Sequence, residues 1–225
     1  MSELDIFDIL GPIMIGPSSS HTAGAVRLGN MAALIYRHPI HRVDFYLHGS
    51  FAKTYKGHGT DVALVGGIMG MTPDDERLPK TFDLAGQKHI EFSFREADLG
   101  YVHPNTVKFV IQGQAGEMEI IGSSLGGATI EVIKINQTDV SLRGDYPTLI
   151  LKYADKPGII SHISSIISSV GVNIAGMKVT RTRKIATMVL ELDGTIDRAT
   201  FQRFEADPVF LSISDIGSVE VQDAL

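Results

Sequence analysis

Residues 16–24 read Gly-Pro-Ser-Ser-Ser-His-Thr-Ala-Gly, and a segment with helical periodicity follows them to about Tyr36. Apolar residues recur there at positions 25, 28, 32 and 35, which predicts a helix with Ser19 or Ser20 as its N-cap. The free N–H groups and partial positive charge of a helix N-terminus suit a carboxylate or phosphate, and serine hydroxyls add donors. Taken by itself, however, the stretch favours a plainer interpretation, a serine-rich capped turn with a surface histidine.

The composition bounds the class of protein. The 225 residues suffice for one or two domains with their own cores, and the net charge of −6 comes without any basic stripe, which argues against nucleic-acid binding. No apolar run approaches the roughly 18 to 20 residues that span a bilayer, and no secretory signal is visible, so we expect a cytoplasmic protein. The chain has no cysteine, so any cysteine-ligated cluster must be brought by another polypeptide.

The first half of the chain is expected to form an α+β domain that ends near residue 142. Val43, Phe45 and Leu47 alternate with polar residues, which predicts a half-buried strand over 42–48. A short helix over 62–71, capped by Thr60 or Asp61, is weakened by three glycines. Further predictions are strands over 89–94, 106–111, 117–121 and 128–135, a charged loop over 72–77 and a glycine-bearing turn over 122–127.

The pattern restarts after Arg-Gly-Asp-Tyr-Pro, residues 143–147, which we interpret as a linker. Strands are predicted over 148–153, 172–180, 186–192 and 212–221, and helices over 159–170 and 197–204, the second capped by Asp197. The order βαββαβ is the split ferredoxin-like unit. We therefore predict an N-terminal α+β domain over 1–142 and a C-terminal ferredoxin-like domain over 148–225.

Four histidines of the first domain, His21, His48, His58 and His103, stand in loops or at strand ends beside Gly, Ser or Asn. One such histidine is usually structural or exposed, but four in one small domain indicate a site, because sites are commonly built from loops. His58 has the strongest claim, since glycines flank it and Asp61 follows closely. A nearby carboxylate raises the pKa of an imidazole and orients it, which suits a general acid or base. Asp61 can also be a helix cap, and the two roles are compatible.

Other familiar motifs are missing or ambiguous. The sequence contains no dinucleotide-binding fingerprint, no P-loop and no H-E-x-x-H zinc spacing, and no strand–elbow–helix surrounds a single serine. In the second domain, Asp155-Lys156-Pro157-Gly158 opens a helix and Gly171-Val172-Asn173-Ile174 opens a strand. These are either ordinary connections or a pocket in which the helix N-terminus and Asn173 bind an amino acid, and the residues leave both interpretations open.

Two motifs, residues 16–24 and Tyr55-Lys56-Gly57-His58-Gly59-Thr60-Asp61, resemble the β chains of two-chain, iron–sulfur-dependent bacterial L-serine dehydratases. His103-Pro104-Asn105-Thr106 and Ser123-Ser124-Leu125-Gly126-Gly127 extend the resemblance over essentially the whole chain. The second domain is similar to ACT domains, regulatory modules that often bind amino acids, through residues 155–158 and 171–174. The first domain also resembles the serine-sensing, allosteric-substrate-binding (ASB-like) fold of some phosphoglycerate dehydrogenases.

The dehydratase resemblance implies conversion of L-serine to pyruvate and ammonia in an active site shared with an α subunit. It implies a [4Fe–4S] cluster that acts as a Lewis acid on the substrate hydroxyl and is held by cysteines of the α chain, with no metal ligand in this chain. L-serine is then substrate or effector, and a homodimer through the ACT or the N-terminal domain is expected, with no nucleic-acid or membrane partner.

The resemblance also implies residue roles. His58 would remove the α-proton, Asp61 would orient it and His21 would be a second polar contact, although His21 also remains a candidate base. The expected substrate-binding residues are Ser18, Ser19, Ser20, Thr22, Gly59, Thr60 and Asn105. Asp155, Gly158 and Asn173 are the expected effector contacts, while Lys156-Pro157 restricts the first loop and favours a dimer interface instead. The alternatives are a non-catalytic regulatory subunit that senses an amino acid and a free-standing sensor.

Overall fold

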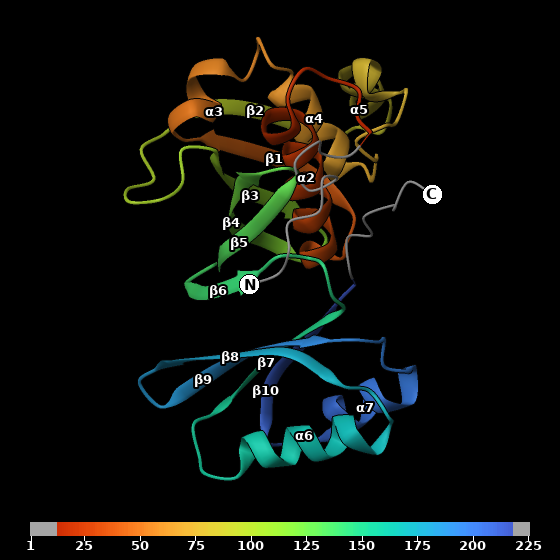
Figure 1. The fold of residues 1–225 in the computed structure, drawn as a ribbon, viewed down its shortest axis with the longest axis vertical. Helices are drawn as coiled ribbons and strands as arrows, with labels where there is room; N and C mark the ends of the chain where they lie inside the picture. Colours follow the sequence, from red (N-terminus) through yellow and green to blue (C-terminus); the bar gives the residue numbers. More distant parts are fainter. Residues whose placement is uncertain (1–12, 218–225) are drawn as a thin grey trace. The chain divides into compact units, whose positions relative to one another are not determined.

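The computed structural model describes residues 13–217, which divide after Gln137 into two compact units (Figure 1). The chain is a mixed α+β fold with two sheets, as predicted. Residues 143–147, the predicted linker, contain no helix or strand. Within residues 13–217, no helix combines the length and apolarity needed to cross a membrane.

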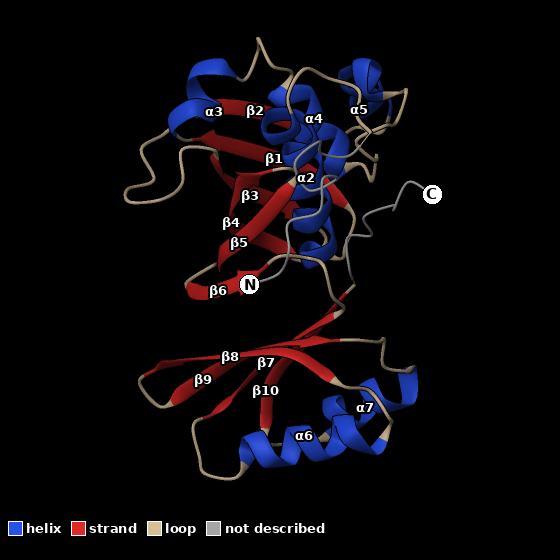
Figure 2. Ribbon diagram, viewed as in Figure 1, coloured by secondary structure: helices blue, strands red, loops and turns tan. Residues whose placement is uncertain are grey.

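A six-stranded sheet of order β2-β1-β3-β4-β5-β6 dominates the first half of the chain (Figure 2). Strand β1 pairs in parallel with β2 and antiparallel with β3. The strands are β1 Ile40–Leu47, β2 Glu91–Glu96, β3 Thr106–Gly113, β4 Gly116–Gly126, β5 Thr129–Ile135 and β6 Thr138–Leu142. The helical segments are the π-helical turn η1 Ser19–Ala23, α2 Gly24–Tyr36, α3 Gly49–Thr54, α4 Thr60–Ile68, the 3-10 turn η2 Leu78–Lys80 and α5 Thr81–Gln87.

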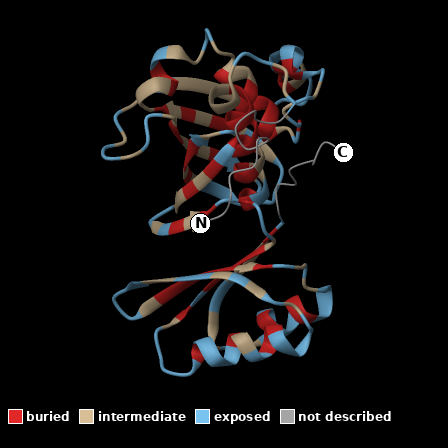
Figure 3. Cartoon of the chain, viewed as in Figure 1, coloured by how far each residue is buried: buried red, intermediate tan, exposed pale blue. Residues whose placement is uncertain are grey.

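Helices α2 and α4 pack against each other with their backbones in contact. A Cβ on Gly29 would lie 2.5 Å from the Leu64 carbonyl oxygen and 2.9 Å from the Gly67 Cα, so neither glycine has room for a side chain. Helix α2 is buried along most of its length, with Leu28 fully buried (Figure 3). Gly67, one of the glycines that were predicted to weaken α4, therefore permits a close helix crossing, and the helix spans residues 60–68 rather than 62–71.

Both predicted N-caps in this unit are wrong. The cap of the first helical segment is Ser18, whose Oγ accepts the His21 backbone N–H at 3.2 Å, and not Ser19 or Ser20. Helix α4 is preceded by Gly59 in the left-handed region (φ 68°), which a glycine adopts without strain, and not capped by Thr60 or Asp61. In each case the capping position lies one residue before the first of the two predicted residues.

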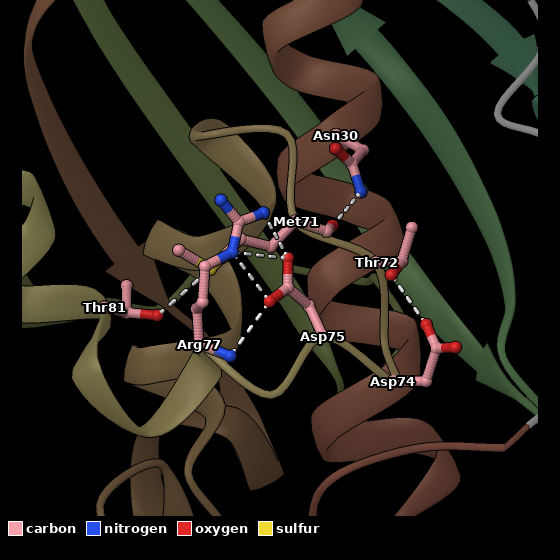
Figure 4. A network of polar contacts seen from close by, with 7 residues as sticks. All are labelled: Asn30, Met71, Thr72, Asp74, Asp75, Arg77 and Thr81. Atoms are coloured by element: carbon pink, nitrogen blue, oxygen red, sulfur yellow. Dashed lines mark hydrogen bonds and ion pairs between the residues drawn. The ribbon is translucent and has the colours of Figure 1, made fainter.

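Helices α3 and α5 and strand β6 were not predicted, and β4 runs through Gly126, across most of the predicted turn at 122–127. The predicted charged loop is confirmed as a turn held by its own side chains (Figure 4). Thr72 Oγ1 donates to Asp74 at 2.6 Å, and the Arg77 Nε donates to Asp75 at 2.9 Å. The polar side chains of this turn thus bond to one another within a few residues of sequence.

The second unit has the predicted order βαββαβ: β7 Thr148–Ala154, α6 Ile159–Ser169, β8 Ile174–Thr182, β9 Ile185–Leu192, α7 Arg198–Ala206 and β10 Phe210–Ile216. Its sheet order is β10-β7-β9-β8, and α6 and α7 cover one face (Figure 2). Leu151, Ile163 and Phe204 belong to the core between them. Asp197 caps α7 as predicted, accepting the Thr200 N–H at 2.7 Å. The predicted last strand extends to 221, beyond the described residues.

Candidate functional site

The His21 ring is held at both nitrogens by serine hydroxyls. Its Nδ1 lies 3.3 Å from Ser18 Oγ, and its Nε2 lies 3.1 Å from Ser50 Oγ at the start of α3. The fully buried Phe51 ring packs 5.3 Å away, centroid to centroid. His21 stands on the π-helical turn η1, a distortion frequently found at functional sites. The turn and α3 together therefore fix this imidazole in one orientation.

His58 lies next to His21, with ring centroids 4.8 Å apart and planes at 84°. The Thr22 hydroxyl donates to the His58 carbonyl at 3.3 Å, which ties the glycine-flanked loop to η1. The Nδ1 of His58 is buried and has no hydrogen-bond partner within residues 13–217. Both nitrogens of the His21 ring are thus bonded, while His58 has a buried nitrogen that no described group bonds.

Burial shifts the pKa of two groups in this site. Burial, and after it the neighbouring His58, lowers the pKa of His21, so His21 is neutral at neutral pH. Burial raises the pKa of Asp61. The hydrogen bond that its carboxylate accepts from the Val62 N–H at 2.9 Å acts in the opposite direction but is the smaller effect. His58 Nδ1 has no partner within residues 13–217, so Asp61 does not bond this nitrogen, and the orientation of His58 by Asp61 stays a prediction.

Ser124 joins the end of β4 to the two predicted loops. Its Oγ donates to the Ser20 carbonyl at 2.9 Å, and its N–H donates to the Asn105 carbonyl at 2.9 Å. Gly24, at the start of α2, packs so closely on Ser124 that a Cβ would overlap its hydroxyl. The structure therefore links Ser20 and Asn105, which are both half-buried, through a serine that was not predicted as a site residue.

The four histidines do not all converge. His48 accepts the Leu99 N–H at 3.2 Å from a loop distant in sequence, and the exposed His103 accepts the Asn105 N–H of its own loop at 3.2 Å. The predicted substrate residues Thr22 and Thr60 are 4% and 0% exposed, which places them behind the surface of the site. Ser18, Ser19 and Gly59 are partly exposed.

Sequence reasoning missed Ser50 and Ser124. Ser50 is the second residue of α3, shortly after the end of β1, and its N–H donates to the Pro104 carbonyl at 2.8 Å, in the segment that carries Asn105. The position at a strand end was a usable signal, but a single serine in a Gly-Ser pair is too common to single out.

The donor set does not fit an iron–sulfur cluster. The chain has no cysteine, and residues 13–217 contain no group of three or more His, Asp or Glu residues arranged to hold a metal ion. A cluster of this kind needs thiolate ligands, which this chain does not have.

The second unit has an open hollow of about 360 Å³ at the N-terminus of α6. It is lined by Tyr153, Asp155, Lys156, Pro157, Gly158, Ile159, Ile160 and Arg181. The Arg181 guanidinium and the Asp155 carboxylate pair at 3.1 Å across it. Of the predicted effector contacts, Asp155 and Gly158 line the hollow. Asn173 does not line it, and its N–H is bonded to Asp193 at 2.9 Å.

Fold and site together define a protein with an α+β unit that carries paired histidines among serine hydroxyls, followed by a ferredoxin-like unit. Residues 2–85 match the family model of the serine dehydratase beta chain, and residues 148–208 match that of the ACT domain. The chain is 44% identical to the L-serine dehydratase beta chain of Peptoniphilus asaccharolyticus, over 86% of this chain and 89% of that one. It is 38% identical to the probable L-serine dehydratase beta chain of Bacillus subtilis, over 96% and 99%.

The chain therefore belongs to the family of L-serine dehydratase β chains, and the predicted family and ACT fold are confirmed. The chain is also 22% identical to the D-3-phosphoglycerate dehydrogenase of Methanocaldococcus jannaschii, over 88% of this chain and 37% of the relative.

Proposed function

We propose that this chain is the β subunit of an L-serine ammonia-lyase that converts L-serine to pyruvate and ammonia, and that it is catalytically complete only with an α subunit. The observation that carries the proposal is the buried Nδ1 of His58, which lacks a partner within residues 13–217 and lies beside the neutral His21. An imidazole nitrogen without a hydrogen-bond partner is suited to act as a general base toward a C–H group. The names of the two β-chain relatives support L-serine as the substrate.

In this proposal His58 takes the α-proton of serine, the C–O bond at the β-carbon breaks, and the departing hydroxide takes up that proton from His58 to become water. The resulting enamine tautomerises and hydrolyses to pyruvate and ammonia. Ser18, Ser19 and Ser20, which are partly exposed, are proposed to bind the substrate carboxylate together with Asn105. Gly59, in its left-handed conformation, leaves open space next to His58, since a Cβ there would meet nothing within 4 Å. The site therefore combines a base, hydroxyl donors and room for a small substrate.

The [4Fe–4S] cluster belongs to the α subunit in this proposal, because this chain has no thiolate to bind it. This chain then supplies histidine and serine side chains to the shared active site and no ligand to the cluster. A cytoplasmic location and a homodimer through the ACT or the N-terminal unit remain predictions.

The ACT unit is proposed to regulate the enzyme or to form its dimer interface. The hollow at the N-terminus of α6 favours a second candidate function, a non-catalytic subunit that senses an amino acid, because Asp155 and Arg181 carry charges opposite to those of an amino acid's two groups. Their pairing with each other weighs against it.

In the catalytic role, substitutions in the first unit abolish turnover with the cluster intact. In the sensing role, they change activation or cooperativity.

The test is His58→Ala in the two-chain enzyme obtained by co-expression with a cysteine-bearing partner, measured as pyruvate formation. Loss of a general base lowers kcat by about 10²–10⁴-fold. The matched control is His103→Ala, which removes an exposed ring bonded only to its own loop and is expected to keep turnover within a few-fold. Iron–sulfur absorbance must be the same in all three proteins. Near-normal turnover of His58→Ala would exclude His58 as the base.

A further inference from the structure

His21 differs from every other histidine of the first unit in being bonded through both ring nitrogens. Ser18 lies 3.3 Å from Nδ1 and Ser50 lies 3.1 Å from Nε2. Ser50 itself is fixed by its backbone: its N–H donates to Pro104 at 2.8 Å, and its carbonyl accepts the Thr54 hydroxyl at 2.8 Å. The hydroxyl that faces His21 therefore comes from a rigid position.

The hydrogen bonds of Ser18 favour one tautomer of His21. Ser18 Oγ already accepts the His21 backbone N–H at 3.2 Å, and its single hydrogen is free to donate to Nδ1. Nδ1 is then an acceptor, so the neutral ring carries its hydrogen on Nε2 and donates it to Ser50 Oγ. In the opposite tautomer Ser50 would donate to Nε2, and Ser18 Oγ would accept two N–H groups while its own hydrogen lost this acceptor. The favoured arrangement gives each serine oxygen one N–H donor.

A charge on His21 would interfere with the chemistry next to it. The two rings lie 4.8 Å apart, and a protonated His21 would oppose the uptake of a second proton by His58. His58 is the titratable group that acts on the His21 ring within residues 13–217, and Phe51, Ser18 and Ser50 around it are uncharged. No carboxylate among them stabilises a positive His21.

We propose that Ser50 is a positioning residue: together with Ser18 it fixes His21 as the Nε2–H tautomer and keeps it uncharged, so that His58 alone accepts the substrate proton. The proposal rests on the proposed dehydratase function and decides between the two candidate bases. It assigns a role to a residue that the family motifs around His21 and His58 do not include.

The first test reads the His21 ring directly, without turnover. The full chain is labelled with ¹⁵N-histidine, and the ring signals are followed by NMR between about pH 5 and 8, the range in which histidines titrate. His21→Gln assigns the His21 signal. We expect a single Nε2–H tautomer in the wild type. In Ser50→Ala we expect a tautomer mixture and an upward shift of the His21 pKa, because water reaches the ring. Ser50→Thr, which keeps a hydroxyl, restores the wild-type spectrum.

The second test is the pH profile of kcat in the two-chain enzyme. Ser50→Ala is expected to lose activity progressively as the pH falls, by about tenfold for each pH unit below the new His21 pKa, and to recover at alkaline pH. A purely structural role would lower kcat by the same factor at all pH values, and that result overturns the proposal.

An Nδ1–H or protonated His21 in the wild type, or an unchanged His21 signal in Ser50→Ala, also overturns it. These NMR outcomes do not depend on His58→Ala, whose turnover tests the proposed function separately.

Discussion

The two candidate sites differ in what their polar groups already bind. In the hollow of the second unit, the Asp155 carboxylate meets the Arg181 guanidinium at 3.1 Å. In the first unit, His58 Nδ1 and Thr60 Oγ1 are buried and have no partner within residues 13–217. An unpaired buried polar group costs about 1–3 kcal/mol, and such a group in a native protein calls for a catalytic or ligand-binding explanation. In the first site the unpaired His58 Nδ1 is in keeping with its proposed role toward a ligand, while the Thr60 hydroxyl, which is 0% exposed, is unpaired at a cost in stability. In the second site the two charged groups bond to each other.

Thr60→Val measures the cost of the unpaired hydroxyl. Valine has the same shape and no polar atom, so the free energy of unfolding should rise by about 1–3 kcal/mol. Because Thr60 is 0% exposed, the KM for serine should not change. Urea unfolding and steady-state kinetics of the two-chain enzyme check both. A large increase in KM would instead place the Thr60 hydroxyl in contact with substrate, as the sequence alone predicted.

A pair of N-cap substitutions, Ser18→Ala and Asp197→Ala, separates stability from function. Each removes a side chain that accepts a helix N–H, and each should lower the free energy of unfolding by about 1 kcal/mol. Only Ser18→Ala also releases His21 Nδ1, so only it should lower turnover. Equal turnover losses in the two variants would show that the cap, and not the bond to His21, is what activity requires.

The pH dependence of stability tests the burial of His21. Its pKa in the folded chain lies below the ordinary 6.5, so below that pH the unfolded chain binds a proton that the folded chain does not. Stability should therefore fall as the pH drops from about 6.5 through the folded pKa. His21→Gln should flatten this part of the urea-unfolding profile, and His103→Gln is the matched control. An equal slope in His21→Gln would contradict a buried neutral ring.

Arg181→Ala is expected to have the smallest effect. The pair with Asp155 is largely exposed, and such pairs contribute about 0–1 kcal/mol. Isothermal titration with millimolar serine should give the same heat for the full wild-type chain and for Arg181→Ala. A heat of binding that disappears in the variant would make the hollow an effector site and reverse the comparison with the first unit.

The second unit could be predicted almost completely from the sequence. Its strands are short apolar runs bounded by turn residues, and its helices carry one apolar face, as in the Ile163 and Ile166 stripe of α6, so local sequence patterns define each element. Asp197 is a strong capping residue just before such a face, and its role was visible too. The first unit depends more on contacts between residues that are distant in the sequence. Gly29 and Gly67 count against a helix by propensity, yet the crossing of α2 and α4 requires them.

The candidate site was predictable only where a motif marked it. His21 and His58 lie in conspicuous Ser-rich and Gly-rich stretches, and the structure brings their rings together. Ser50 reaches His21 across 29 residues of sequence, so no spacing pattern could reveal it. His48 was predicted to converge with them, but its ring accepts the Leu99 N–H from an irregular loop whose path no periodicity specifies.

In the proposed enzyme this chain completes an active site whose cluster another chain carries. The most direct measurement is pyruvate formation from L-serine by three purified preparations: this chain alone, the cysteine-bearing α chain alone, and the two together. We predict turnover and iron–sulfur absorbance in the combined preparation, and no pyruvate from this chain alone. Pyruvate formation by this chain alone at the rate of the combined preparation would contradict the account.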